Sequence, residues 1–171
     1  MNKTKRKKSA KRVFVAIDGS NFYHLLKEPP VDLHNLLEFD YTSFARWLAN
    51  KGKVVSQTYY TGAVRAKPGE RKAQKLRRSQ QKLFARLENS GWQIERGFIL
   101  KTGGKYHEKG VDVKIAVDIV VGAYEDLYDR LILVSSDTDL LPALELGFSH
   151  ATETRLLRKD DLIPFVSDEG L

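Results

Sequence analysis

The sequence predicts an α/β domain of three layers, with a mostly parallel sheet between two layers of helices. Two apolar runs, residues 13–17 and 131–134, have the length and composition of strands that are buried on both faces. Elsewhere, helix-like and strand-like segments alternate, which is typical of helices that connect parallel strands. The length of 171 residues suits one domain with a single well-buried core. We expect residues 13–171 to form that domain.

Five elements are expected between the two apolar runs, each with its own signal. They are a helix ended by two prolines, a helix with apolar residues at i, i+3 and i+4, a β-branched and aromatic strand, a long helix after a Pro-Gly pair, and a third strand. In this order they occupy residues 20–28, 41–51, 53–62, 69–89 and 92–100. A polar loop that contains glycine is expected at residues 101–109.

Residues 111–121 fit two structures. Alternate positions are apolar and β-branched, which is the period of a strand. A buried helix also fits, because it would place Ile115 and Ile119 on one face. The alternation favours the strand. A fourth clear strand at residues 131–135 and a helix at residues 138–146 follow.

The composition excludes several kinds of site. Cysteine is absent, which rules out a disulfide framework, a thiolate metal site and a cysteine nucleophile. No apolar stretch approaches the roughly 20 residues of a membrane helix. No apolar signal-peptide region follows the basic N-terminus either. We therefore expect a cytoplasmic protein with no membrane partner.

Charge is distributed unevenly along the chain. Residues 1–12 hold seven Lys or Arg and no acid, so the net charge of +7 comes from this end and the remainder is neutral. We expect residues 1–12 to form a disordered arm, which either binds phosphates or is simply solvated. Residues 65–86 carry nine basic residues against one acid, and residues 108–145 carry nine acids against three basic residues. This polarity is typical of a protein that grips a polyanion beside an acidic pocket, although a solvated lysine-rich helix gives the same pattern.

Acidic side chains follow both apolar runs. Asp18 ends the first run, within Asp18-Gly-Ser-Asn21, and Asp137 and Asp139 follow the second. Ligands of open parallel sheets bind beyond the carboxyl ends of the strands, so the three carboxylates meet there if the strands are neighbours. Crowded carboxylates repel unless a cation lies between them, and their hard oxygen atoms suit Mg²⁺ or Mn²⁺. The alternative is structural, with a turn at Asp18 and a helix cap at Asp137.

Three motifs occur in order along the chain: Ile17-Asp-Gly-Ser-Asn21, Lys109-Gly-Val-Asp-Val-Lys-Ile-Ala-Val-Asp118 and Val134-Ser-Ser-Asp-Thr-Asp-Leu140. Together they resemble the NYN domain family, in its DUF88 branch of PIN-like nucleases. The resemblance implies a Rossmann-like, PIN-like fold with one acidic site that depends on Mg²⁺ or Mn²⁺ and cleaves RNA. It also implies that residues 111–121 form a helix.

The same resemblance implies the residues of the site. The catalytic and metal-binding carboxylates would be Asp18, Asp112, Asp137 and Asp139. Asn21 would hydrogen-bond the first carboxylate or a metal-bound water. Asp118 is expected only to support the centre, because on a helix it points about 120° away from Asp112. Ser135 and Ser136 are expected to support it as well.

The basic segment is expected to bind the RNA backbone, which gives affinity but little choice of sequence. The partner would be single-stranded or structured RNA. The expected contacts are Arg65, Arg71, Lys72, Lys75 and Arg78.

One departure from the family concerns the end of the sheet. Members continue past the aspartate motif with a helix and another parallel strand, which lead to a Gly-Phe-Ser-like turn. Here only residues 143–146 separate Pro142 from Gly147, which leaves no room for that strand. We therefore expect either a sheet that lacks its last edge strand or a chain from which that segment is missing.

Two functions other than a ribonuclease remain open. A non-catalytic or weakly catalytic RNA-binding module would keep the acidic pocket, although it has little reason to collect aspartates where they repel phosphate. A small-molecule phosphohydrolase would use the same metal site without needing the basic segment. Residues 102–106 lack the spacing of a phosphate-binding loop, so an NTPase is not expected.

Overall fold

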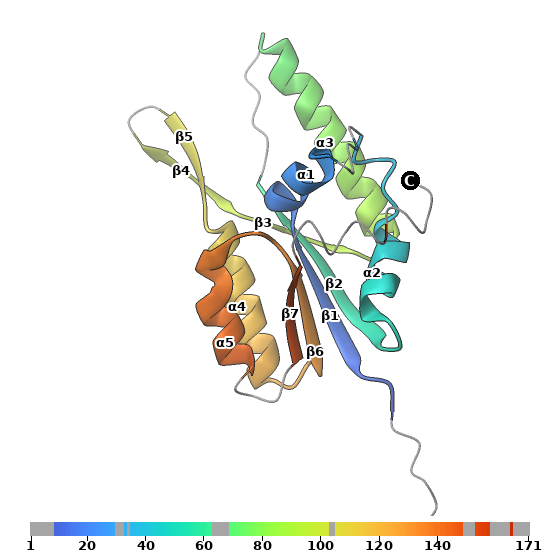
Figure 1. Ribbon diagram of the computed structural model, residues 1–171. Helices are drawn as coiled ribbons and strands as arrows, with labels where there is room; N and C mark the ends of the chain where they lie inside the picture. Colours follow the sequence, from blue (N-terminus) through green and yellow to red (C-terminus); the bar gives the residue numbers. More distant parts are fainter. Residues whose placement is uncertain are drawn as a thin grey trace, which may run out of the picture.

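The computed structural model describes residues 9–29, 33, 35–62, 69–102, 105–148, 153–157 and 165. Within them, five parallel strands form a central sheet (Figure 1). Their bounds are β1 Arg12–Asp18, β2 Lys53–Thr61, β3 Gln93–Arg96, β6 Arg130–Val134 and β7 Glu153–Leu157. Their spatial order is β3-β2-β1-β6-β7. The predicted α/β class with a parallel sheet is confirmed.

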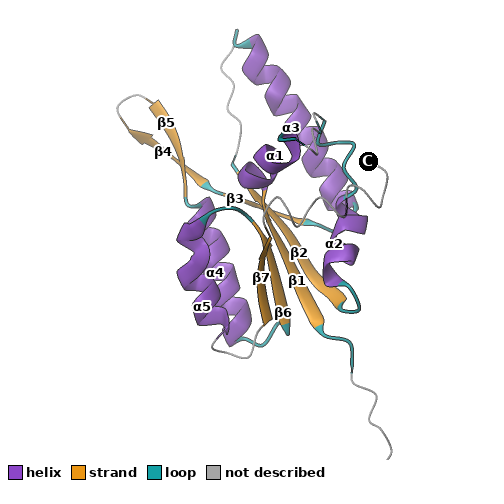
Figure 2. Cartoon of the chain, viewed as in Figure 1, coloured by secondary structure: helices purple, strands orange, loops and turns teal. Residues whose placement is uncertain are grey.

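Helices cover both faces of this sheet (Figure 2). One face carries α1 Gly19–Lys27, α2 Tyr41–Ala49 and α3 Arg71–Asn89. The other carries α4 Val111–Tyr124 and α5 Leu141–Phe148, with a short 3-10 helix, η1 Thr138–Leu140, before α5. In the part of the chain described, no helix is both long and apolar enough to cross a membrane.

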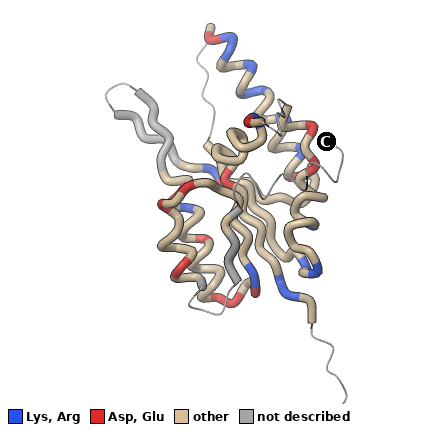
Figure 3. Tube along the Cα trace, in the orientation of Figure 1, with Lys and Arg blue, Asp and Glu red and all other residues tan. Residues whose placement is uncertain are grey.

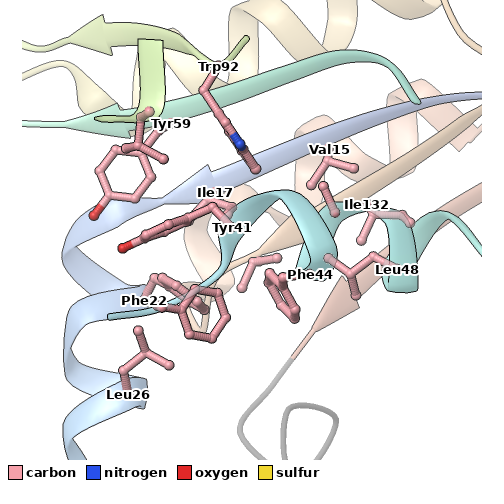
Figure 4. Close-up of a cluster of buried hydrophobic side chains, with 14 of the residues drawn as sticks. Val15, Ile17, Phe22, Leu26, Tyr41, Phe44, Leu48, Tyr59, Trp92 and Ile132 are labelled. Atoms are coloured by element: carbon pink, nitrogen blue, oxygen red, sulfur yellow. The ribbon is translucent and has the colours of Figure 1, made fainter. Parts of the chain in front are cut away.

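Alternate residues of β1 build two separate cores. Val13, Val15 and Ile17 pack with α1, α2 and α3 in a core rich in aromatic rings, part of which is drawn in Figure 4. Phe14 and Ala16 belong to the opposite core, with α4 and α5. Because consecutive residues of a strand face opposite sides, a strand between two cores needs an unbroken apolar run. The first apolar run of the sequence meets this need and lies at the centre of the sheet.

Residues 111–121 are helical, so the strand favoured by their alternation is wrong and the helix implied by the family resemblance is confirmed. Ile115 and Ile119, one turn apart, are buried against the sheet. Val113 and Val117 lie on the exposed face of α4 and supply the other apolar positions. Apolar residues on both faces of the helix thus produce a period of two and conceal the period of 3.6.

A hairpin replaces the end of the third predicted strand and the loop after it. The third strand ends with β3 at Arg96. After Gly97 the chain forms an antiparallel pair, β4 Phe98–Thr102 and β5 Lys105–Lys109, which projects from the body of the domain (Figure 1). The loop predicted at residues 101–109 is therefore wrong. Most of these residues are polar, so they lack the apolar alternation on which strand prediction depends.

The sheet also has the edge strand that we expected to be missing. β7 pairs with β6 in parallel, beginning with Glu153 opposite Arg130. Helix α5 follows η1 directly and ends at Phe148, so the strand comes after the Gly147-Phe148 motif and not before it. The expectation of a missing edge strand is therefore wrong.

Arg12, which we assigned to the N-terminal arm, is the first residue of β1. Its guanidinium forms ion pairs with Asp126 and Asp129, and its backbone N–H donates to Asp129 at 2.6 Å. These contacts raise the pKa of Arg12 and lower the pKa of Asp129. They fasten the start of β1 to the loop between α4 and β6. Residues 1–8 of the predicted arm lie outside the described residues.

Candidate active site

The two strands that end in aspartate motifs are neighbours in the sheet. β1 and β6 pair in parallel, so both motifs follow the same edge. A cleft of about 940 Å³ opens there, and its lining includes Asp18, Asn21, Asp112 and Asp137. Three of the predicted carboxylates, one from each motif, therefore face a common cavity.

Asp18 is held by hydrogen bonds on both of its oxygen atoms. As the N-cap of α1, its Oδ1 accepts bonds from the backbone N–H groups of Ser20 and Asn21 at 3.1 and 3.2 Å. Its Oδ2 accepts bonds from Asn21 Nδ2 and from Ser135 Oγ, the latter at 3.0 Å. Because Asp18 is only 1% exposed, these donors replace the water that its charge has lost. The bond from Asn21 that the family resemblance implied is present.

Gly19 allows a tyrosine to pack against the start of α1. A Cβ atom at residue 19 would lie 2.4 Å from Cε1 of Tyr59, far inside contact distance. The Tyr59 hydroxyl donates to the carbonyl oxygen of Gly19 at 3.4 Å. Burial, and then the negative charge of Asp18, raise the pKa of Tyr59, which therefore stays protonated. The glycine after Asp18 is thus required by the ring that packs beside it.

Two serines join the third motif to the first. Ser135, which donates to the first carboxylate, also accepts a bond from the backbone N–H of Asp137 at 3.0 Å. Ser136 Oγ donates to Asn21 Oδ1. Asp137 then caps η1, where its Oδ1 accepts a bond from the backbone N–H of Asp139 at 2.9 Å. Ser135 therefore supports Asp18 through a direct hydrogen bond, whereas Ser136 supports it only through Asn21.

Asp112 faces the cleft from the first turn of α4. Gly110 begins this helix with a φ of 87°, in the left-handed region that favours glycine. Burial, and then the charges of Asp18, Asp137 and Asp139, raise the pKa of Asp112. Asp112 therefore lies in the negative field of the other three carboxylates. Asp139 is exposed on η1 and contributes to this field without lining the cleft.

The chemistry of these donors suits a divalent cation, although the side chains do not form a finished coordination site. Crowded carboxylate oxygens are what Mg²⁺ and Mn²⁺ bind, and a cation relieves their repulsion. Among the residues that the structure describes, no three acidic, histidine or cysteine side chains are grouped closely enough to hold a metal ion. Binding would therefore draw the carboxylates together and exchange some of the hydrogen bonds on Asp18.

Asp118 fastens α4 to the sheet. Its Oδ2 accepts a bond from the Tyr60 hydroxyl at 3.0 Å, and its Oδ1 accepts one from Lys114 Nζ at 2.7 Å. Lys114 also lies 4.0 Å from Glu95 on β3. These contacts hold the helix that carries Asp112. Asp118 therefore supports the cleft only indirectly, by fixing the position of α4.

The basic helix α3 forms another side of the cleft. Lys and Arg mark its length in Figure 3, whereas Asp and Glu gather on α4 and α5. The predicted RNA contacts on α3 are all exposed: Arg71, Lys72, Lys75 and Arg78. Since a helix turns about 100° per residue, Lys72 and Lys75 lie nearer the cleft-lining side, which carries Leu76 and Ser79. Arg65 lies outside the described residues.

One wall of the cleft is apolar, and it was not foreseen. Its side chains come from α1, from the turn at residues 35–38 and from α3. They are Tyr23, Leu36, Leu37, Leu76, Leu83 and Phe84. In the sequence these positions look like ordinary core residues. The one signal available is that the apolar stripe of α3 continues to Leu76, in the most basic part of the helix.

Comparisons with known proteins agree with this arrangement. The family model of the NYN domain matches residues 12–157. Curated protein sequences gave no match. A crystal structure of a protein of unknown function from Vibrio parahaemolyticus is similar in fold, with a TM-score of 0.64 at 20% identity over 88% of this chain and 83% of that one. Because the family model spans most of the sequence and all three motifs, the chain belongs to the NYN domain family.

Proposed function

We propose that this protein is a metal-dependent endoribonuclease of the DUF88 branch of the family. The observation that carries the proposal is the meeting of Asp18, Asp112 and Asp137 at one cleft beside a basic helix. NYN domains are PIN-like nucleases, which supplies the class of reaction. A protein that only bound RNA would gain nothing from carboxylates placed where phosphate must lie, because like charges repel.

The four carboxylates would hold Mg²⁺ or Mn²⁺, and these are Asp18, Asp112, Asp137 and Asp139. A divalent cation there would neutralise charge on the phosphate and lower the pKa of an attacking water. The protein itself contributes by positioning these carboxylates. Asn21 and Ser135 fix Asp18 before RNA arrives, so less ordering remains to be done during the reaction.

The exposed cations of α3 would bind the phosphates on either side of the scissile bond. Lys72 and Lys75 are best placed, since they lie beside the cleft-lining side of the helix. The six basic residues that precede Arg12 would add further contacts. Such contacts release counterions and give affinity that depends on salt and little on sequence.

An RNA-binding module with slow or no turnover is the second candidate, and one observation favours it. Both carboxylate oxygens of Asp18 are engaged in hydrogen bonds, and the described chain contains no finished three-ligand group. If those bonds persisted when metal was present, the cleft would bind RNA without hydrolysing it. A small-molecule phosphohydrolase would leave the basic face of α3 without a role.

Cleavage of RNA tests the proposal. The full chain is incubated with end-labelled single-stranded or hairpin RNA in Mn²⁺, Mg²⁺ or EDTA. We expect metal-dependent cleavage, which Asp18→Asn and Asp137→Asn reduce by about a hundredfold or more. The matched control is Asp126→Asn, an 85% exposed side chain between α4 and β6, which should retain full activity. Metal-independent cleavage, or full activity in both site variants, contradicts the ribonuclease, and RNA binding without cleavage under every metal favours the binding module.

A further inference from the structure

We infer that the apolar wall of the cleft is a subsite for one unpaired nucleobase of the RNA, next to the phosphate at the carboxylates. The inference rests on the proposed function, because it names the part of the RNA that this cleft recognises. The cleft has two unlike sides, the carboxylates on one and apolar side chains of α1, α3 and the turn at residues 35–38 on the other. Hydrolysis uses only the carboxylates, which leaves the apolar side available to another part of the same RNA.

Leu76 is the exposed side chain of the apolar wall. The apolar stripe of α3 leaves the core at this residue, because Leu83 and Leu87 are 5% and 1% exposed whereas Leu76 is 50% exposed. Leu76 lines the cleft together with Leu83. A leucine left half in water forgoes much of the favourable free energy of burial. A flat apolar ligand placed against it would recover that free energy. The face of a nucleobase is such a surface, and Tyr23 in the same wall is of the aromatic kind on which bases stack.

Cations on the same helix match the charge of a nucleotide. Lys72 lies one turn before Leu76, and Lys75 directly precedes it, with both side chains exposed. A base against Leu76 would therefore have its phosphate beside the ammonium group of Lys72, with Lys75 about 100° further around the helix. An apolar peptide or a lipid chain would leave these charges, and the carboxylates on the other side, without a partner. The charge pattern thus favours a nucleotide over a purely apolar ligand.

The dimensions of the cleft favour an unpaired base. A volume of about 940 Å³ is at the upper end of the range of ligand pockets, about 300–1,000 Å³, so a base fits with its sugar and phosphate. In a duplex the faces of the bases are stacked, so a base must leave the helix to reach Leu76. Three polar side chains lie on this side, those of Asn35, Ser79 and Gln80. Two of them already form hydrogen bonds: Asn35 donates to Glu38 at 2.8 Å, and Gln80 donates to the carbonyl oxygen of Gly62 at 2.6 Å. We therefore expect the subsite to require an unpaired base and to accept more than one kind.

Fluorescence of 2-aminopurine tests the subsite directly. Short single-stranded RNAs carry this base at successive positions and are bound to the full chain with the substitution Asp137→Asn, which prevents hydrolysis. We expect the fluorescence to change at one position, and Leu76→Ala to remove this change and weaken binding about fivefold or more. The control is Leu127→Ala, which truncates a leucine of similar exposure, 55%, in the loop between α4 and β6. It should change neither the signal nor the affinity.

Cleavage by the unsubstituted chain, measured in parallel, keeps the two proposals apart. Cleavage without a position-dependent signal overturns the subsite and leaves the ribonuclease standing. A signal that depends on Leu76, without cleavage under any metal, supports the subsite and overturns the ribonuclease. The subsite is also overturned if Leu76→Ala leaves the signal unchanged or if a duplex binds as tightly as the single strand. Failure to bind any RNA overturns both proposals.

Discussion

Ser135 Oγ donates a hydrogen bond of 3.0 Å to Asp18 Oδ2, between residues 117 positions apart in the sequence. Both residues are almost completely buried, with 0% and 1% of their surfaces exposed, so water does not compete for this bond. Ser135 also accepts a bond from the backbone of Asp137. One hydroxyl group therefore couples the aspartates of two motifs.

Replacing Ser135 should affect stability and activity together. Ser135→Ala leaves a buried oxygen of Asp18 and the backbone N–H of Asp137 without this partner, and we expect the free energy of unfolding to fall by about 1–3 kcal/mol. Urea denaturation measures this loss, and RNA cleavage should fall with it. Ser136→Ala is the matched control, because Ser136 is exposed and its loss should cost under about 1 kcal/mol. Equal losses in the two variants would show that the buried bond has no special role.

Gly19 should be more sensitive to alanine than another helical glycine. Gly19→Ala forces its Cβ into the ring of Tyr59, and we expect a loss of about 1–3 kcal/mol with a displaced Asp18. Gly147→Ala is the control, since the nearest atom would lie 3.5 Å away and alanine favours a helix, so stability should hold or rise. Thermal unfolding compares the two. A neutral Gly19→Ala would refute the close packing of Tyr59.

Replacing aspartate with asparagine at two positions of α4 should have opposite effects on stability. Without metal, Asp112→Asn removes repulsion from the other carboxylates, and we expect the free energy of unfolding to rise slightly. Asp118→Asn weakens the bonds to Lys114 and Tyr60, and should lower it by about 1 kcal/mol. Unfolding in urea with EDTA gives both values. Adding Mn²⁺ should stabilise the wild type more than Asp112→Asn, and equal stabilisation would speak against Asp112 as a ligand.

The ion pairs at the start of β1 should make stability depend on pH. The side chain of Arg12, and then its backbone N–H, lower the pKa of Asp129. A carboxylate with a lower pKa in the folded chain stabilises the fold above its unfolded pKa, about 3.9, and this contribution is lost as the pH falls through the folded value. Asp129→Asn should therefore lower stability at pH 7, and the difference from the wild type should shrink as the pH falls below about 3.9. Urea denaturation at each pH measures this difference. A difference that stayed constant across the range would exclude the ion pair as its cause.

The sequence revealed the centre of the fold because local chemistry specifies it. A strand buried on both faces requires an apolar run such as residues 13–17. The aspartates after β1 and β6 were expected to meet if the two strands were neighbours, and the strands are neighbours. Residues 111–121 could not be assigned in this way. Valines on the exposed face of α4 imitate a strand, and only the family resemblance indicated the helix that presents Asp112.

The remaining differences between prediction and structure arise where contacts between distant segments determine the conformation of the chain. The β4–β5 hairpin consists largely of polar residues, and β7 follows the Gly147-Phe148 motif, whereas the family pattern places a strand before it. The apolar wall of the cleft was missed because Leu76 has the same helical spacing as buried Leu83. Spacing along a helix does not show whether a side chain is buried or exposed. Side-chain contacts between distant segments, such as the ring of Tyr59 on Gly19, are likewise visible only in the folded chain.

Binding of Mn²⁺ to the full chain, followed by the loss of the free-ion electron paramagnetic resonance signal, tests the central claim most directly. We expect saturable binding, weakened about tenfold or more by each of Asp18→Asn, Asp112→Asn and Asp137→Asn. Asp126→Asn, outside the cleft, should bind like the wild type. An absence of saturable binding, or equal affinity in all the variants, would contradict a metal site built by these carboxylates.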